Sequence, residues 1–273
     1  MNNEIALFSP IFNEQETLGE ILARIPVKID GVKTRLYIVD DGSEDRSAEI
    51  AREFTDNVIV LPHNMGVGAA TKVGLQKIVQ DGNASHVIKF DADGQHDIEL
   101  IPRVYRLLSH HDVVTCSRFH PESDQSSTPL DRLILNITFS SVFKAITGVA
   151  LSDVRTGFMG FRIEHVELVA PHLIVERYGI PIELLLRVWN GRADVSFYEI
   201  PHPAMYYEDI SQKLNHRYST ETLDAKSRRV SDAYNAVLRV VDDMNLDIRG
   251  EMFMNNGFGL INSSKGEKQM IAV

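Results

Sequence analysis

Short apolar runs alternate with helical repeats through the first 117 residues, and this alternation constrains the fold more than any other feature of the sequence. The apolar runs have the length and composition of buried strands. Between them, apolar residues recur at spacings of three and four, as in Leu18, Ile21 and Ile25, which predicts helices. The pattern indicates an α/β domain with a mainly parallel sheet. The expected strands are residues 4–8, 35–39, 58–61, 87–90 and 113–116.

Polar clusters follow each of the expected strands. Ligands of parallel α/β sheets bind at the carboxyl ends of the strands, where such clusters would meet. Turn chemistry alone is a weaker explanation, because the coincidence occurs at five strand ends. We therefore expect a nucleotide pocket at this edge of the sheet. The clusters are Asn13-Glu14, Asp40-Asp41, Asn64 to Gly68, Asp91 to His96 and Ser117-Arg118.

Two carboxylates, Asp91 and Asp93, lie where the strand of residues 87–90 ends. Residues i and i+2 of an extended segment point to the same side, so both carboxylates can face one cation. Hard divalent ions such as Mg2+ and Mn2+ take oxygen ligands, and Mg2+ often shares its shell with substrate phosphates. A turn after the strand is the alternative use of Asp and Gly. The local sequence leaves the choice between a metal site and a turn open.

Two other strand ends give weaker signals. Gly66 and Gly68 lack the third glycine of a dinucleotide fingerprint, since position 71 is threonine. They form either a tight turn before a helix or a backbone loop that lines a sugar-nucleotide pocket. The segment of Asp41 either caps the next helix through Ser43 or Asp45, or places a carboxylate against a nucleobase or ribose. The other strand ends favour the second use.

The second half of the sequence is less regular. The most apolar window, residues 133–151, is interrupted by Asn136 and Lys144, whereas a spanning helix needs about 20 mainly apolar residues. We therefore expect no membrane span. Residues 246–273 are expected to form a tail. The other expected elements are helices over 133–149 and 182–189, strands over 159–162 and 195–200, and an amphipathic helix over 219–245 that packs on the domain or forms a homodimer.

The chain of 273 residues has 38 acidic and 28 basic side chains, which give a formal net charge of -10. This balance argues against nucleic-acid binding, which requires a basic face. The single cysteine, Cys116, permits no internal disulfide and fits a reducing compartment. The first residues lack the basic and apolar regions of a signal peptide. We expect a cytoplasmic protein that is soluble or peripheral on the cytoplasmic face of a membrane.

Several motifs occur in a fixed order between residues 4 and 210. They are Pro10-x-Phe12-Asn13-Glu14, Val39-Asp40-Asp41-Gly42-Ser43, Asn64-x-Gly66-x-Gly68-x-Ala70, Asp91-Ala92-Asp93-Gly94-Gln95-His96, Ser117-Arg118-Phe119, Arg132, Asp153-x-x-Thr156-Gly157-Phe158-x-x-Phe161-Arg162 and Glu183. In this order and spacing they resemble the motifs of family 2 glycosyltransferases. More narrowly, they are similar to the dolichyl-phosphate mannose synthase and polyprenyl-phosphate glycosyltransferase branch.

The resemblance implies a GT-A fold, in which helices cover both faces of a mainly parallel sheet. It implies an inverting transfer from a UDP- or GDP-sugar with Mg2+ or Mn2+. It also implies one domain over residues 1–245, with a nucleotide-binding half over 1–118 and an acceptor-side half over 119–245. The acceptor would be a polyprenyl phosphate or a glycan, and the sequence leaves this choice open.

The resemblance also implies roles for single residues. Asp91 and Asp93 would approach the donor diphosphate, Asp93 most directly through the metal. Gln95 would lie near the diphosphate or the transferred sugar, and Arg118 would be a cation on the phosphate side. The residues expected around the base and ribose are Pro10, Phe12, Asn13, Glu14 and Asp41, with Gly66 and Gly68 in the adjoining loop.

The chemistry of the acceptor decides whether a base is needed. A lipid phosphate has a second pKa of about 6 and is already an anion, whereas a hydroxyl must lose its proton to a carboxylate. Asp153 and Glu183 are the candidate bases, and structural salt bridges with Arg155 and Arg187 are the alternative. Residues 120–127 lack the basic or glycine-rich character expected beside an acceptor phosphate.

Two alternative functions compete with sugar transfer. Sugar-phosphate nucleotidyltransferases resemble one another in a glycine-rich, arginine-containing loop after the first strand. This chain has Phe12-Asn13-Glu14 at that place, which disfavours the nucleotidyltransferase. A non-catalytic sugar-nucleotide-binding or scaffold protein would not need four residues that are intact here, namely Asp91, Asp93, Gln95 and Arg118. A small basic cluster near the end of the motifs either closes over the diphosphate or forms a solvated loop. Its members are Lys213, His216 and Arg217.

Overall fold

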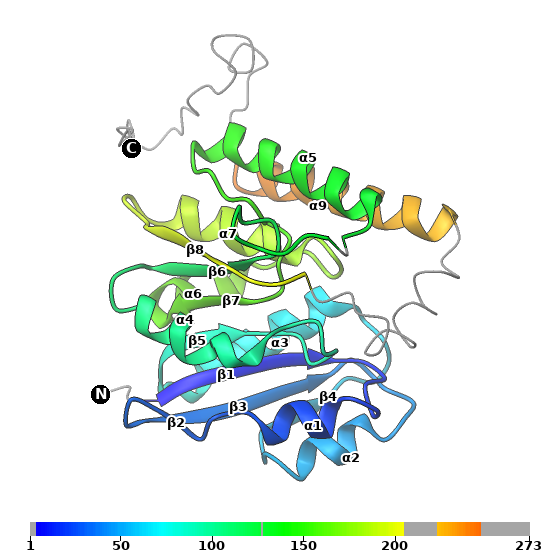
Figure 1. Ribbon diagram of the computed structural model, residues 1–273, viewed down its shortest axis with the longest axis vertical. Coiled ribbons are helices and arrows are strands. Elements are labelled where there is room, and N and C mark those ends of the chain that lie inside the picture. Colours follow the sequence, from blue (N-terminus) through cyan, green and yellow to red (C-terminus); the bar gives the residue numbers. More distant parts are fainter. Residues whose placement is uncertain (1–3, 127, 205–222, 247–273) are drawn as a thin grey trace.

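The computed structural model describes residues 4–126, 128–204 and 223–246, and Figure 1 shows strands stacked into one sheet between layers of helices. The sheet has the order β2-β3-β1-β5-β7-β6-β8, and β4 pairs with β3. The strands are β1 (Glu4–Ile11), β2 (Lys28–Ile29), β3 (Val32–Asp40), β4 (Val58–Val60), β5 (Ala84–Lys89), β6 (Val113–Ser117), β7 (Met159–Arg162) and β8 (Phe197–Pro201).

The expected mainly parallel sheet is confirmed. β1 pairs in parallel with β3 and β5, β3 with β4, and β6 with β8. The antiparallel exceptions are the hairpin of β2 with β3 and the insertion of β7 between β5 and β6. Because β7 runs backwards, its first residue, Met159, lies beside Lys89 at the end of β5. The segment before β7 therefore meets the carboxyl ends of the parallel strands.

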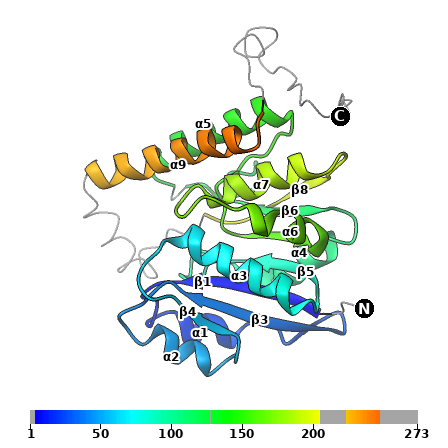
Figure 2. The same ribbon diagram turned by 180° about the vertical axis from the view of Figure 1, so that it is seen from behind.

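Helices cover both faces of the sheet, because strand residues alternate between two apolar layers. Phe8 packs with α3, α6 and α7, whereas Leu7 packs with α1, α2 and α4. Figure 2 shows α3, α6 and α7 on the near side. The helices are α1 (Leu18–Ala23), α2 (Ser47–Arg52), α3 (Val67–Asp81), α4 (Ile101–Leu107), α5 (Leu130–Thr147), α6 (Ile163–Val169), α7 (Ile180–Gly191) and α9 (Leu223–Asp243).

Two short elements were not expected from the sequence. They are β2 in the first half and α6 in the second, and both are too short to show a period. The long helix packs on α7 through buried Ala233 and Val237, and its homodimer stays a prediction. Leu246, expected in the tail, is buried and donates its amide to Val241. No helix within the described residues is long and apolar enough to cross a membrane.

Candidate functional site

A cavity of about 490 Å³ opens where β1, β3, β5 and β6 end. Its lining contains most of the residues singled out in the sequence: Pro10, Phe12, Glu14, Asp41, Gly66, Asp91, Asp93, Gln95 and Arg118. The predicted gathering of strand-end side chains is thus observed. Four candidates lie outside the lining, namely Asn13, Gly68, Asp153 and Glu183. Lys213, His216 and Arg217 lie outside the described residues.

Asp41 organises the loop after β4. Its carboxylate accepts the amide of Met65 at 2.7 Å and the amide of Gly66 at 2.9 Å. Gly66 has a φ of +104°, and a Cβ there would collide with the carbonyl oxygen of Glu176, so only glycine fits without strain. The carboxylate expected to bind the nucleotide therefore also holds the loop that lines the cavity.

Asn13 and Gly68 were expected at the nucleotide, and the structure gives them other contacts. The backbone amide of Asn13 donates to Ser43 Oγ, and its side-chain Oδ1 accepts the backbone amide of Glu44. Asn13 therefore fixes the end of β1 to the neighbouring loop. Gly68 donates its amide to the carbonyl of Glu176 at 2.8 Å. A Cβ at Gly68 would collide with the backbone of residues 175–177, so close packing explains this glycine.

Neither Ser43 nor Asp45 is the N-cap of α2; the N-cap is Arg46, which makes no side-chain cap hydrogen bond. Asp45 accepts the amide of Ser47, the first residue of α2. Ser43 instead donates its hydroxyl to Asp40 at 2.6 Å. The segment after β3 is therefore a hydrogen-bonded turn that presents Asp41 to the cavity.

Asp91 and Asp93 have unlike surroundings. The Lys89 ammonium lies 2.7 Å from Asp91 Oδ1, and the amide of Asp91 donates to His96 Nδ1. Burial would raise the pKa of Asp91, but the charge and the hydrogen bond of Lys89 outweigh it and lower the pKa. Burial, followed by the charge of Asp91, raises the pKa of Asp93 to about 6. Asp93 accepts only the amide of Gln95 among the hydrogen bonds of the described residues.

This donor set fits a hard divalent cation. Carboxylate oxygens are the ligands that Mg2+ and Mn2+ prefer, and a cation would relieve the repulsion between Asp91 and Asp93. No group of three or more His, Cys, Asp or Glu side chains in a metal-binding arrangement occurs within the described ranges. A cation bound here would therefore need oxygen ligands from a substrate or from water as well.

Gln95 presents an unused donor to the same region. Its Nε2 is buried and has no hydrogen-bond partner among the residues that the structure describes. Buried polar groups in native proteins are nearly always hydrogen-bonded. The side chain lines the cavity, so a ligand oxygen would satisfy it.

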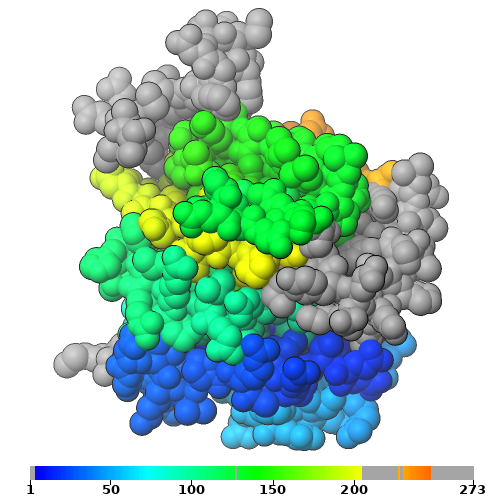
Figure 3. Space-filling model, in the orientation of Figure 1, coloured from blue at the N-terminus to red at the C-terminus, as the bar shows by residue number. Residues whose placement is uncertain are grey.

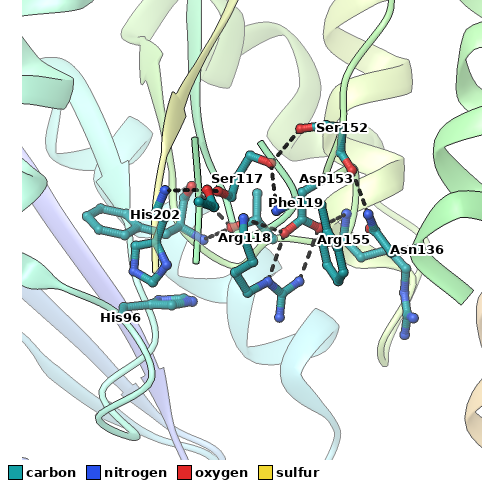
Figure 4. A network of polar contacts seen from close by, with 12 residues as sticks. His96, Ser117, Arg118, Phe119, Asn136, Ser152, Asp153, Arg155 and His202 are labelled. Atoms are coloured by element: carbon teal, nitrogen blue, oxygen red, sulfur yellow. Dashed lines mark hydrogen bonds and ion pairs between the residues drawn. The ribbon is translucent and has the colours of Figure 1, made fainter. Parts of the chain in front are cut away.

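Arg118 is fixed by Asp153 (Figure 4). Its Nε donates to Asp153 Oδ2 at 2.8 Å, and its Nη2 donates to Oδ1 at 3.1 Å. Asp153 was expected as a base or as a partner of Arg155, but its side chain is fully buried and forms its ion pair with Arg118. The backbone amide of Arg155 also donates to Asp153. In this geometry Asp153 positions an arginine of the cavity wall, which does not support the role of a base.

Glu183 is also a structural carboxylate. It accepts the amides of Ile174 and Val175 and the Nε of Arg187 at 2.7 Å, and its side chain is fully buried. The predicted alternative of a salt bridge with Arg187 is confirmed, and the role as a base is not supported by this geometry. Glu183 fixes the segment that leads to Arg177, which lines the cavity.

The sequence model of glycosyl transferase family 2 matches residues 7–168. The chain belongs to glycosyl transferase family 2. It is therefore a glycosyltransferase, and the alternatives of a nucleotidyltransferase and a non-catalytic scaffold are set aside. The resemblance noted in the sequence motifs is confirmed.

Relatives of this family 2 glycosyltransferase have names that specify polyprenyl or dolichyl phosphate chemistry. The UDP-N-acetylglucosamine–dolichyl-phosphate N-acetylglucosaminyltransferase of Methanococcus voltae is 26% identical over 223 residues, which cover 75% of this chain and 86% of the relative. The polyprenol monophosphomannose synthase of Mycolicibacterium smegmatis is 28% identical over 200 residues, covering 70% of this chain and 74% of the relative.

Solved structures confirm the GT-A fold. A crystal structure of glucosyl-3-phosphoglycerate synthase from Mycobacterium tuberculosis in complex with Mn2+, uridine diphosphate and phosphoglyceric acid has a TM-score of 0.65 to this chain. The sequence identity is 15%, and the alignment covers 87% of this chain and 78% of that one. The likeness concerns the fold alone.

The cavity of this glycosyltransferase holds more cations than the sequence motifs indicated. Arg132, Arg155 and Arg177 line the cavity together with Arg118, and so does Lys89. Arg118 follows β6 directly, whereas Arg132, Arg155 and Arg177 lie away from the strand ends. A lysine inside an apolar strand was a usable signal, because buried lysines are rare unless they are paired.

Proposed function

We propose that the chain transfers a sugar from a nucleoside diphosphate sugar to a polyprenyl phosphate, with inversion and with Mg2+ or Mn2+ as cofactor. The observation that supports this most is the composition of the cavity wall. The carboxylates of Asp91 and Asp93 share one cavity with four arginines, namely Arg118, Arg132, Arg155 and Arg177. Such a wall suits two groups of phosphate oxygens, one on the donor and one on the acceptor.

On the donor side, Asp93 would hold the cation, with Asp91 beside it, and the cation would neutralise charge on the departing diphosphate. The unused Nε2 of Gln95 would donate to a phosphate or sugar oxygen. Arg118, held in place by Asp153, would face the same negative charge without having to reorganise. The base is uracil or guanine in this proposal, and the name of the Methanococcus voltae relative supports a UDP-sugar.

On the acceptor side, a phosphate fits better than a hydroxyl. The two predicted bases, Asp153 and Glu183, are buried in ion pairs with Arg118 and Arg187. A phosphate monoester, with a second pKa of about 6, needs no base at neutral pH. It would instead be recognised by arginines such as Arg132, whose planar guanidinium matches phosphate oxygens.

The surface beside the cavity supports a lipid acceptor. Leu130, Ile134 and Ile137 are 71%, 55% and 56% exposed on α5, at the spacing of one helical face. Arg132 and Asn136 of the same helix line the cavity. Figure 3 shows this helix in green on the outside of the molecule. We place this face against the membrane that holds the polyprenyl chain, as a peripheral contact.

A donor panel tests the proposed activity. The protein is incubated with a polyprenyl phosphate, Mn2+ and each of several UDP- and GDP-sugars, and the lipid products are identified by mass spectrometry. The account expects one donor to give a glycosyl phosphodiester, and Asp93→Ala to reduce its formation by about two orders of magnitude or more. Undiminished transfer by Asp93→Ala would contradict the role of the metal site. Absence of product from every donor would contradict the proposed function.

A further inference from the structure

Lys89 is a buried cation inside the sheet. It is the last residue of β5, lies between its register partners Phe8 and Met159, and is 2% exposed. Burying an ammonium is costly unless it is paired and hydrogen-bonded. Lys89 meets both conditions, since its Nζ lies 2.7 Å from Asp91 Oδ1 and 3.3 Å from the carbonyl oxygen of Gly157.

The contacts of Lys89 make the two carboxylates of the site unequal. Asp91 Oδ1 is occupied by the ammonium, and Oδ2 lies so close to Gly157 that an added Cβ would collide with it. The Asp91 carboxylate is therefore held between β5 and the segment before β7, although its side chain is 32% exposed and lines the cavity. Asp93 accepts a single amide hydrogen, from Gln95, among the contacts of the described residues. Only Asp93 keeps most of its oxygen lone pairs for a ligand.

Resting on the function proposed above, we propose that Lys89 neutralises Asp91, so that the divalent cation binds through Asp93 together with the donor diphosphate. Asp91, Asp93 and Lys89 then contribute a net charge of -1 to the site. The affinity of oxygen sites for divalent cations depends on the number of charged ligands. Lys89 would thus keep affinity for the free cation low and make metal binding depend on the nucleotide. Lys89 is a positioning residue in this scheme.

Removing the charge of Lys89 should strengthen Mn2+ binding, whereas a substitution that disrupts the site would weaken it. In Lys89→Met and Lys89→Gln, Asp91 becomes available as a second carboxylate ligand. Mn2+ binding without nucleotide, measured by the electron paramagnetic resonance signal of the free ion, should become about tenfold tighter than in the wild type. Adding UDP or GDP should then increase Mn2+ affinity less in these variants than in the wild type.

Two controls separate this effect from a general loss of charge. The double variant Lys89→Met/Asp91→Asn removes both partners, so its Mn2+ affinity should return to the wild-type value. Lys72→Met removes another lysine, whose Nζ donates to the carbonyl of Leu173 and which does not line the cavity. Its Mn2+ affinity should equal that of the wild type.

Unchanged or weaker Mn2+ binding in folded Lys89→Met and Lys89→Gln would overturn the proposal. Loss of folding in both, with folding restored in the double variant, would also overturn it, because the ion pair would then serve stability alone. The titration without nucleotide requires no sugar transfer. Tighter binding in the lysine variants, combined with a wild type that transfers no sugar, would therefore refute the proposed function and leave the role of Lys89 standing.

Discussion

Replacing Asp153 by asparagine distinguishes an anchor for Arg118 from a catalytic base. Asp153 accepts four hydrogen bonds, three from Arg118 and one from the amide of Arg155. Asparagine has nearly the same volume, but it removes the negative charge and turns one acceptor into a donor. Arg118, whose side chain is 18% exposed, then keeps its charge and loses its partner.

The expected cost follows from the burial of the pair. Breaking a buried ion pair by removing one partner destabilises a protein by about 3–5 kcal/mol. Asparagine retains one acceptor, so we expect the lower end, about 3 kcal/mol, in urea unfolding. A misplaced arginine also loses a charged hydrogen bond to phosphate, worth about 1.5–3 kcal/mol. The KM for the nucleotide-sugar donor, whose diphosphate Arg118 would bind, should therefore rise about 10- to 100-fold.

A double-mutant cycle with Arg118→Gln completes the test. If the two side chains act as one unit, the stability losses of Asp153→Asn and Arg118→Gln should be clearly non-additive, by about 1–3 kcal/mol. Unfolding and steady-state kinetics are measured on the same preparations. A variant Asp153→Asn that keeps wild-type stability and KM but loses kcat would refute the anchor and restore the base.

Three further predictions concern the same cavity. Glu183→Gln should lower the free energy of unfolding by about 3 kcal/mol, because Glu183 is the buried partner of Arg187. Asp243→Asn removes the half-exposed second partner of Arg187 and should lower it by under about 1 kcal/mol. Urea unfolding measures both losses, and equal losses would contradict the reasoning. Because the folded-state pKa of Asp93 is raised from 3.8 to about 6, the metal-free folded state binds more protons between these values, and its stability should fall as pH rises from 4 to 7. Thermal unfolding against pH should show this fall weakened in Asp93→Asn, and an equal fall in both proteins would argue against it. Gly66→Ala should lower the free energy of unfolding by about 3 kcal/mol, because backbone strain and a collision with the backbone add. Gly82 also has a positive φ but faces open space, so Gly82→Ala should lower it by about 1 kcal/mol. Similar losses in chemical unfolding would contradict the role given to close packing at Gly66.

The parts of the site that follow strands directly were predictable from the sequence. Asp91 and Asp93 come immediately after the apolar run of β5, so their position at the sheet edge depends only on local pattern and on the rule for parallel sheets. The same reasoning placed Asp41 and Arg118 at the cavity. Their positions directly after strands were sufficient to predict that these residues lie at the cavity.

The roles of buried carboxylates were not predictable, because their partners are distant in sequence. Asp153 pairs with an arginine 35 residues earlier, and only the antiparallel insertion of β7 brings the two together. Glu183 binds backbone amides nine and eight residues before it, contacts that no side-chain pattern encodes. The contacts of Asn13 and Gly68 with neighbouring loops were not predictable for the same reason, and their roles at the nucleotide stay predictions. Motif membership located these residues correctly but did not reveal their burial.

The comparison of two acceptors tests the central claim most directly. A polyprenyl phosphate and the polyprenol of the same chain length differ only in the phosphate that the cavity arginines would bind. With the donor identified by the panel and with Mn2+, the rate of sugar transfer is measured for each lipid. The account predicts rapid transfer to the phosphate and no measurable transfer to the alcohol. Comparable transfer to the polyprenol would contradict it.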